Sequence, residues 1–152
     1  MSGVAVRAAD AADGDVIAAF NAAMARETEQ RELDRATLTR GVERALADPA
    51  KGRYFVAELD GRVAGCLLVT TEWSDWRDGW FWWIQSVYVA LDCRGRGVYA
   101  ALHEHVRAAA RAAGDVVGLR LYVEKDNARA QRTYQKLGMT ETDYRLYEEL
   151  LD

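Results

Sequence analysis

Residues Arg94 to Gly97, with the sequence RGRG, have the composition of an anion-binding loop. Glycine tolerates left-handed backbone conformations, in which successive N–H groups converge on one point. A helix predicted to begin at Val98 adds its positive dipole end, and the two arginines add charge. Together these features predict a site for a pyrophosphate that needs no metal. The same four residues also fit a tight, solvated turn.

The segments that must position this loop alternate between strand and helix patterns. The segment 80–89 just before the loop is rich in aromatic and β-branched residues, which favours a central strand. The dipeptide Asp60-Gly61 predicts a hairpin between two further strands. Expected strands span 4–6, 54–59, 62–70, 80–89, 119–123 and 144–149, and expected helices span 16–28, 35–47, 98–113 and 128–137. Residues 72–79 are interpreted as a polar loop that carries Trp73 and Trp76.

The order of these elements predicts an α/β (α+β) fold. We expect one mixed central sheet of about six to seven strands, flanked by about four helices, in a single domain over residues 1–152. Hairpins come first and a strand–helix–strand crossover follows, so the sheet should contain one parallel pair. The sheet should open where this pair splays apart, and a ligand would sit there.

Composition limits the classes of function. Of the 152 residues, 50% are hydrophobic and 29% are charged, which is typical of a globular protein. A net charge of −4 argues against broad nucleic-acid binding. No apolar run approaches the roughly 18 residues of a membrane helix, and Met1 to Asp10 lack a signal-peptide pattern, so we expect a cytoplasmic protein. Its two cysteines, Cys66 and Cys93, are expected to be reduced thiols.

Residues 86–98, with the sequence SVYVALDCRGRGV, resemble the GCN5-related N-acetyltransferase (GNAT) superfamily. Asn127, Tyr134 and the run 137–139 resemble it too, as does the order of elements over nearly the whole chain. The family signature is Gln or Arg, two residues, Gly, one residue, then Gly or Ala. Arg94 and Gly97 match it, whereas Tyr99 departs from it. A tyrosine can still donate its backbone N–H, so its ring is expected to point away from the loop.

The resemblance implies that acetyl-CoA is the acyl donor and that no metal takes part. Val87 and Val89 match the strand whose backbone pairs with the pantetheine arm, and one of their N–H groups would stabilise the developing oxyanion. Asn127 matches a position that hydrogen-bonds the same arm. The cofactor-binding residues implied in this way are Val87, Val89, Arg94, Gly95, Arg96, Gly97, Val98, Tyr99 and Asn127.

The resemblance also implies direct transfer of the acetyl group to a primary amine. Tyr134 matches a tyrosine that protonates the leaving thiolate, although its helical spacing also fits a core aromatic residue. A base must deprotonate the amine. Glu27, Glu29 and Glu72 are the candidates, and each also fits a solvated surface carboxylate.

Seven carboxylates fall in the segments that border the acceptor side of this fold, which predicts a small cationic amine as the acceptor. They are Glu27, Glu29, Glu32, Asp34, Glu72, Asp75 and Asp78. The cluster also fits the charge balance of an acidic protein. Two alternatives stay open: a protein N-terminus or lysine as the acceptor, and a non-catalytic coenzyme A-binding module. Trp73 and Trp76 fit an acceptor pocket, core packing or the interface of a homodimer.

Two other groups of residues are set aside. His103 and His105 lie two positions apart on a helix, so their side chains diverge and cannot share a metal ion. Cys93 adjoins the anion loop, but no residue in the sequence pairs with it as a base for acyl transfer through a thiol.

Overall fold

The computed structural model describes residues 3–151, which form two compact units that divide between Leu121 and Tyr122. The prediction of one domain over the whole chain therefore stays a prediction. Within residues 3–151, none of the helices combines the length and the apolar character needed to cross a lipid bilayer. The elements, in chain order, are β1 (Ala5–Ala8), α1 (Gly14–Glu29), α2 (Arg35–Ala47), β2 (Arg53–Leu59), β3 (Arg62–Ser74), β4 (Gly79–Val89), α3 (Val98–Ala113), β5 (Val116–Arg120) and α4 (Ala128–Lys136).

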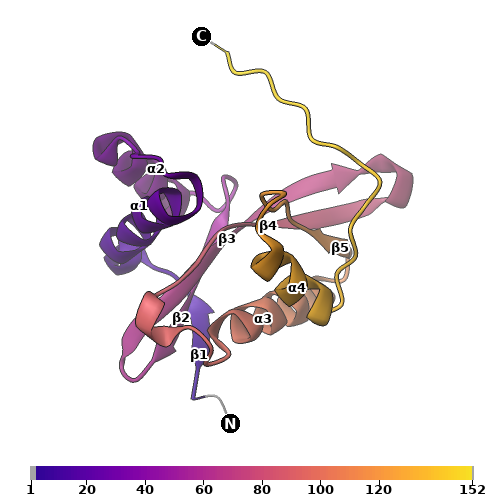
Figure 1. Ribbon diagram of the computed structural model, residues 1–152. Coiled ribbons are helices and arrows are strands. Elements are labelled where there is room, and N and C mark those ends of the chain that lie inside the picture. Colours follow the sequence, from indigo (N-terminus) through magenta and orange to yellow (C-terminus); the bar gives the residue numbers. More distant parts are fainter. Residues whose placement is uncertain (1–2, 152) are drawn as a thin grey trace. The chain divides into compact units, whose positions relative to one another are not determined.

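The first unit is built on one mixed sheet with the order β1-β2-β3-β4-β5 (Figure 1). Neighbouring strands from β1 to β4 are antiparallel, and β4 and β5 form the parallel pair. The mixed sheet, the parallel pair and the four helices confirm the predicted fold class.

The predicted number of strands is wrong, since the sheet of residues 3–151 has five strands instead of six to seven. The segment Tyr144 to Glu149 forms no strand. Its alternating apolar residues imitate a strand pattern, but a strand exists only where its backbone groups find a hydrogen-bonded neighbour. Tyr144 and Leu146 stay exposed instead.

Two boundaries near the site also differ from those expected. The strand β3 runs to Ser74, so Glu72 and Trp73 lie in the sheet rather than in a loop. They pair with Phe81 and Trp80 of β4. The chain reverses direction between β3 and β4 in the short 3-10 turn Asp75–Arg77. The strand β5 starts earlier than predicted, because its ladder begins where Val116 pairs with Trp80.

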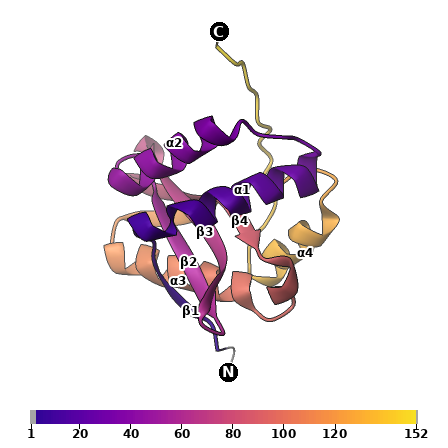
Figure 2. The same ribbon diagram turned by 90° about the vertical axis from the view of Figure 1, so that its left-hand side faces the viewer.

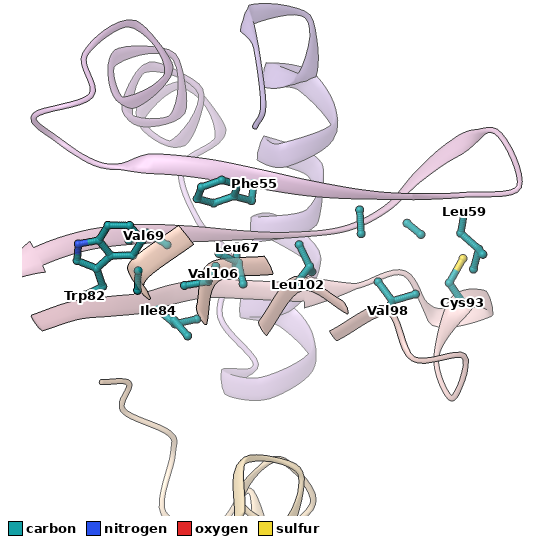
Figure 3. Packing of buried hydrophobic residues seen from close by; sticks show 13 residues of the cluster. Phe55, Leu59, Leu67, Val69, Trp82, Ile84, Cys93, Val98, Leu102 and Val106 are labelled. Atoms are coloured by element: carbon teal, nitrogen blue, oxygen red, sulfur yellow. The ribbon is translucent and has the colours of Figure 1, made fainter. Parts of the chain in front are cut away.

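The two faces of the sheet bury different helices. One face packs against α1 and α2, and the other packs against α3 (Figure 2). Side chains alternate along each strand, so Val56 belongs to the first layer, while its neighbours Phe55 and Ala57 belong to the second. Figure 3 shows the second layer, where Leu67, Trp82 and Ile84 of the sheet meet Leu102 and Val106 of α3. The first turn of α3 is thereby held against the sheet.

Candidate active site

The loop between β4 and α3 has the backbone geometry of an anion nest. Gly95 and Gly97 both adopt left-handed conformations, with φ of 78° and 80°. Gly97 is the N-cap of α3 and has no side chain with which to cap the first turn. The first N–H groups of an α-helix have no intrahelical acceptor, so they face whatever lies before the helix. An anion placed there would receive these N–H groups and the positive end of the helix dipole.

Gly65, a glycine outside the loop, allows the start of α3 to lie close to the sheet. A Cβ atom on Gly65 of β3 would lie 2.9 Å from the Tyr88 carbonyl oxygen and 3.0 Å from the Val98 side chain. Real Cβ atoms almost never come so close, so only glycine allows the start of α3 to pack here. The sequence pattern did not single out Gly65, because the need for it arises from residues far along the chain.

Within residues 3–151, the second half of β4 has a strand partner on one edge and none on the other. The ladder between β4 and β5 covers only Trp80 to Trp83, whereas β4 continues to Val89. The N–H of Ala90 donates to the Ala64 carbonyl of β3 at 2.8 Å. Since successive residues of a strand direct their backbone groups to opposite edges, the N–H and C=O of Val89 point away from β3. On that edge the described part of β5 reaches only Trp83, and the Val89 carbonyl accepts from the Arg94 side chain.

A bulge marks the start of this half of β4. The register with β3 shifts between the pairs Cys66–Tyr88 and Leu68–Gln85, so β4 holds one extra residue there. Ser86 lies in this interval and has a left-handed φ of 53°, which is uncommon for a residue other than glycine. The bulge redirects the strand just before Val87. A serine gives no local signal for this conformation, so the sequence did not predict it.

The two arginines of the loop are engaged with the protein rather than directed at the nest. The Nη2 atom of Arg94 lies 2.9 Å from Glu27 Oε2, and its Nε atom donates to the Val89 carbonyl at 2.9 Å. Arg96 pairs with Asp60 at 3.1 Å. An anion at the nest would therefore be attracted mainly by the backbone N–H groups and the helix dipole. Direct contact of both arginine side chains with phosphate stays a prediction.

Glu27 at the end of α1 is the centre of a polar cluster. One carboxylate oxygen accepts from the Tyr88 hydroxyl at 3.0 Å and the other accepts from Arg94. The hydrogen bond from Arg94 holds the pKa of Glu27 below its usual range. The pKa of Tyr88 is raised by its burial and, to a smaller extent, by its hydrogen bond to Glu27. Glu27 is thus an ionised acceptor at neutral pH and a weaker base than an ordinary glutamate, which argues against it as the general base.

Glu72 and Glu29, the other base candidates, have different surroundings. The Oε1 atom of Glu72 accepts from Arg120 at 2.8 Å and from the indole N–H of Trp83 at 3.1 Å. Arg120 in turn lies over the Phe81 ring, 3.6 Å from its centroid. Glu72 therefore ties β3, β4 and β5 together. Glu29 is the exposed last residue of α1.

Three of the seven carboxylates of the expected rim pair with arginines, and a fourth caps a helix. Besides Glu27 and Glu72, Asp34 caps α2 by accepting from the Thr37 N–H, and Glu32 lies 4.0 Å from Arg26. Within residues 3–151, the side chains left without such a partner are Glu29, Asp75 and Asp78.

Tyr99, which departs from the family signature, is paired within α3. Its hydroxyl lies 3.0 Å from Nδ1 of His103, and the two rings meet edge to face. His103 is fully buried, its Nε2 has no hydrogen-bond partner among the described residues, and burial lowers its pKa. The Tyr99 side chain therefore runs along the helix, in agreement with the expected direction of its ring. Within residues 3–151, no group of three or more His, Cys, Asp and Glu side chains is arranged to hold a metal ion.

Comparisons with known proteins agree with this geometry. A model described as the acetyltransferase (GNAT) family matches residues 16–139. This chain belongs to the GNAT acetyltransferase family. A solved structure of a possible acetyltransferase from Clostridium difficile 630 is 43% identical, covers 98% of both chains and has a TM-score of 0.91. The comparison with curated proteins found no match.

More distant GNAT structures share the fold. A ribosomal-protein-alanine N-acetyltransferase from Brucella melitensis biovar Abortus 2308 is 18% identical, with 98% of this chain and 99% of that chain covered and a TM-score of 0.79. A predicted acetyltransferase from Clostridium acetobutylicum, solved with acetyl-CoA, is also 18% identical, with 96% of each chain covered and a TM-score of 0.77. These two comparisons show the fold alone.

The family uses acetyl-CoA, and the loop of this chain fits its pyrophosphate. A Cβ atom on Gly95 would meet no heavy atom within 4 Å, so there is open space at the nest. Two GNAT positions lie in the second unit. Asn127 caps α4 and accepts from the Ala130 N–H at 3.1 Å. Burial raises the pKa of Tyr134, which keeps its hydroxyl protonated at neutral pH. The roles of both residues toward the cofactor stay predictions.

Proposed function

We propose that this protein is an N-acetyltransferase that transfers the acetyl group of acetyl-CoA directly to a primary amine. The observation that carries the proposal is the anion nest at Gly95 and Gly97, placed immediately after an unpaired edge of β4. A pyrophosphate at the nest would leave the pantetheine arm to follow that edge. The arm would receive hydrogen bonds from the backbone of Val87 and Val89, and from Asn127.

Acetyl-CoA supplies a thioester, at which a C–N bond forms to the amine and the C–S bond breaks. An N–H of Val87 or Val89 would stabilise the negative charge that develops on the carbonyl oxygen. Tyr134 would donate its proton to the departing sulfur, and its raised pKa keeps that proton available at neutral pH. Deprotonation of the amine is assigned to Glu29, Glu72 or a water chain, since Glu27 is held as a weak base.

The proposed acceptor is a small amine with a positive charge. Glu29, Asp75 and Asp78 favour a cation, whereas four of the seven carboxylates on this side are already engaged. A panel of acceptors should therefore include cationic and neutral small amines of equal size. Peptides with a free N-terminus or a lysine represent the protein acceptors.

The test is a thiol-release assay with acetyl-CoA and this panel on the unaltered protein and on Tyr134→Phe. We expect turnover with a small primary amine and a fall in kcat of about 100-fold in Tyr134→Phe, with coenzyme A affinity retained. Tyr147→Phe, at a residue that is 91% exposed, is the matched control and should behave as the unaltered protein. Tight coenzyme A binding without turnover on any acceptor would support the non-catalytic module instead.

A further inference from the structure

Glu27 and Arg94 form a contact that joins α1 to the anion loop. The two residues are 67 positions apart, yet their charged atoms lie 2.9 Å from each other. Both side chains are about one-third exposed. The pair is therefore shielded from water more than a fully exposed ion pair, whose contribution is small.

The contacts of Arg94 fix the direction of its guanidinium group. The Nε atom donates to the Val89 carbonyl, Nη2 donates to Glu27, and the group lies 5.2 Å from the centre of the Tyr88 ring. The Tyr88 hydroxyl in turn donates a hydrogen bond to the other carboxylate oxygen of Glu27. Arg94 is thus held from three sides at the point where β4 ends and the loop begins.

The backbone of Arg94 is part of the anion loop, so holding its side chain also restrains the loop. Gly95 and Gly97 are the most flexible residue type and lose the most conformational freedom when a ligand orders them. A loop that is already ordered binds with a smaller entropic cost. A fixed Arg94 at one end and the helix α3 at the other would restrict these glycines before the cofactor arrives.

We propose that Glu27 is a positioning residue for the cofactor: it holds Arg94 against the end of β4 and so preorganises the pyrophosphate loop. This inference rests on the proposed use of acetyl-CoA. It assigns to Glu27 neither proton transfer nor contact with the cofactor. Its removal should therefore weaken coenzyme A binding and raise the KM for acetyl-CoA, while kcat at saturating substrate is kept.

The experiment measures the Kd of coenzyme A by calorimetry for four proteins: the unaltered chain, Glu27→Gln, Arg94→Met and the double variant. We expect Kd to rise about three- to tenfold in Glu27→Gln. Because Glu27 acts through Arg94, the double variant should bind no more weakly than Arg94→Met alone. Glu43→Gln removes the same charge from an exposed position on α2 and should leave Kd unchanged. Circular dichroism checks that each variant is folded.

Each result bears on the inference. An unchanged Kd in Glu27→Gln, or independent losses that add in the double variant, would overturn it while leaving the proposed function intact. A large fall in kcat with an unchanged KM for acetyl-CoA would also overturn it, since that pattern indicates proton transfer by Glu27. If the unaltered protein does not bind coenzyme A, the proposed function fails and the inference fails with it.

Discussion

The two halves of β4 belong to one strand but have different neighbours. From Trp80 to Trp83 the strand is paired on both sides, with β3 and with β5. Aromatic rings there are covered by arginines, with Arg53 4.6 Å from the Trp82 ring and Arg120 3.6 Å from the Phe81 ring. From Ser86 to Val89 the strand has a bulge, an unpaired edge and a glycine loop after it. We therefore expect the first half to contribute more to stability and the second half to bind the ligand.

The difference shows how a sheet combines rigidity with an opening. A strand paired on both sides has its backbone groups satisfied, so it can offer only side chains. A strand that loses one neighbour offers its backbone N–H and C=O groups as well. The first half can hold the second in place because the two are continuous in one strand and both pair with β3.

The largest effect is expected in the paired half. Trp82 is 6% exposed within the layer against α3, so Trp82→Ala should lower the free energy of unfolding by about 3–5 kcal/mol in urea denaturation. Trp76→Ala is the control, because Trp76 is 86% exposed, and it should change stability by less than about 0.5 kcal/mol. Similar losses in the two variants would show that this half is not the stable one.

The next effect concerns ligand binding at the open half. At Gly97 the φ of 80° strains any other residue, so Gly97→Ala and Gly97→Asp should both weaken coenzyme A binding. Aspartate tolerates this conformation better than alanine, but it also places a negative charge in the nest. We expect a Kd increase of about tenfold for Gly97→Ala and about 50-fold for Gly97→Asp, measured by calorimetry.

The order of these two variants is the decisive outcome. Strain without a bound anion would make Gly97→Asp the milder change. That result would remove the pyrophosphate from this end of α3.

The smallest effect is expected at the bulge that separates the halves. Ser86 holds a left-handed φ of 53°, and glycine adopts this conformation without strain, so Ser86→Gly should stabilise the protein by about 0.5 kcal/mol. Ser74→Gly, at an ordinary φ of −111° in β3, should destabilise it by about 0.5–1 kcal/mol. Urea denaturation of both variants compares the signs. Destabilisation by Ser86→Gly as well would mean that the serine side chain holds the bulge.

Features that depend on neighbouring residues were predicted well. The loop was recognisable because glycines two positions apart, between a strand pattern and a helix pattern, have a local meaning. The helical patterns of α3 and α4 were recognisable for the same reason. The alternation of side chains along a strand also holds for Trp82 and Trp83, since Trp82 enters the core, whereas Trp83 reaches Glu72.

Features that depend on distant residues were missed or predicted wrongly. Residues Tyr144 to Glu149 have the pattern of a strand but no ladder partner. Glu72 was placed in a loop, although β3 extends past it and Arg120, 48 residues away, binds it. The full burial of His103 was not predicted, since no local pattern distinguishes it from His105, whose ring lies 5.3 Å from that of Phe55.

The sequence by itself determined the class of fold, the acetyltransferase family and the position of the glycine loop that we propose binds the pyrophosphate, because each depends on short-range pattern and backbone preference. Only the tertiary structure decided what the loop arginines do. Their partners Glu27 and Asp60 lie far away along the chain, so no spacing could reveal that the charges of Arg94 and Arg96 are already engaged. An anion between Arg94 and Val98 would therefore be bound mainly by the backbone of the loop, and the sheet and α1 determine where that backbone lies.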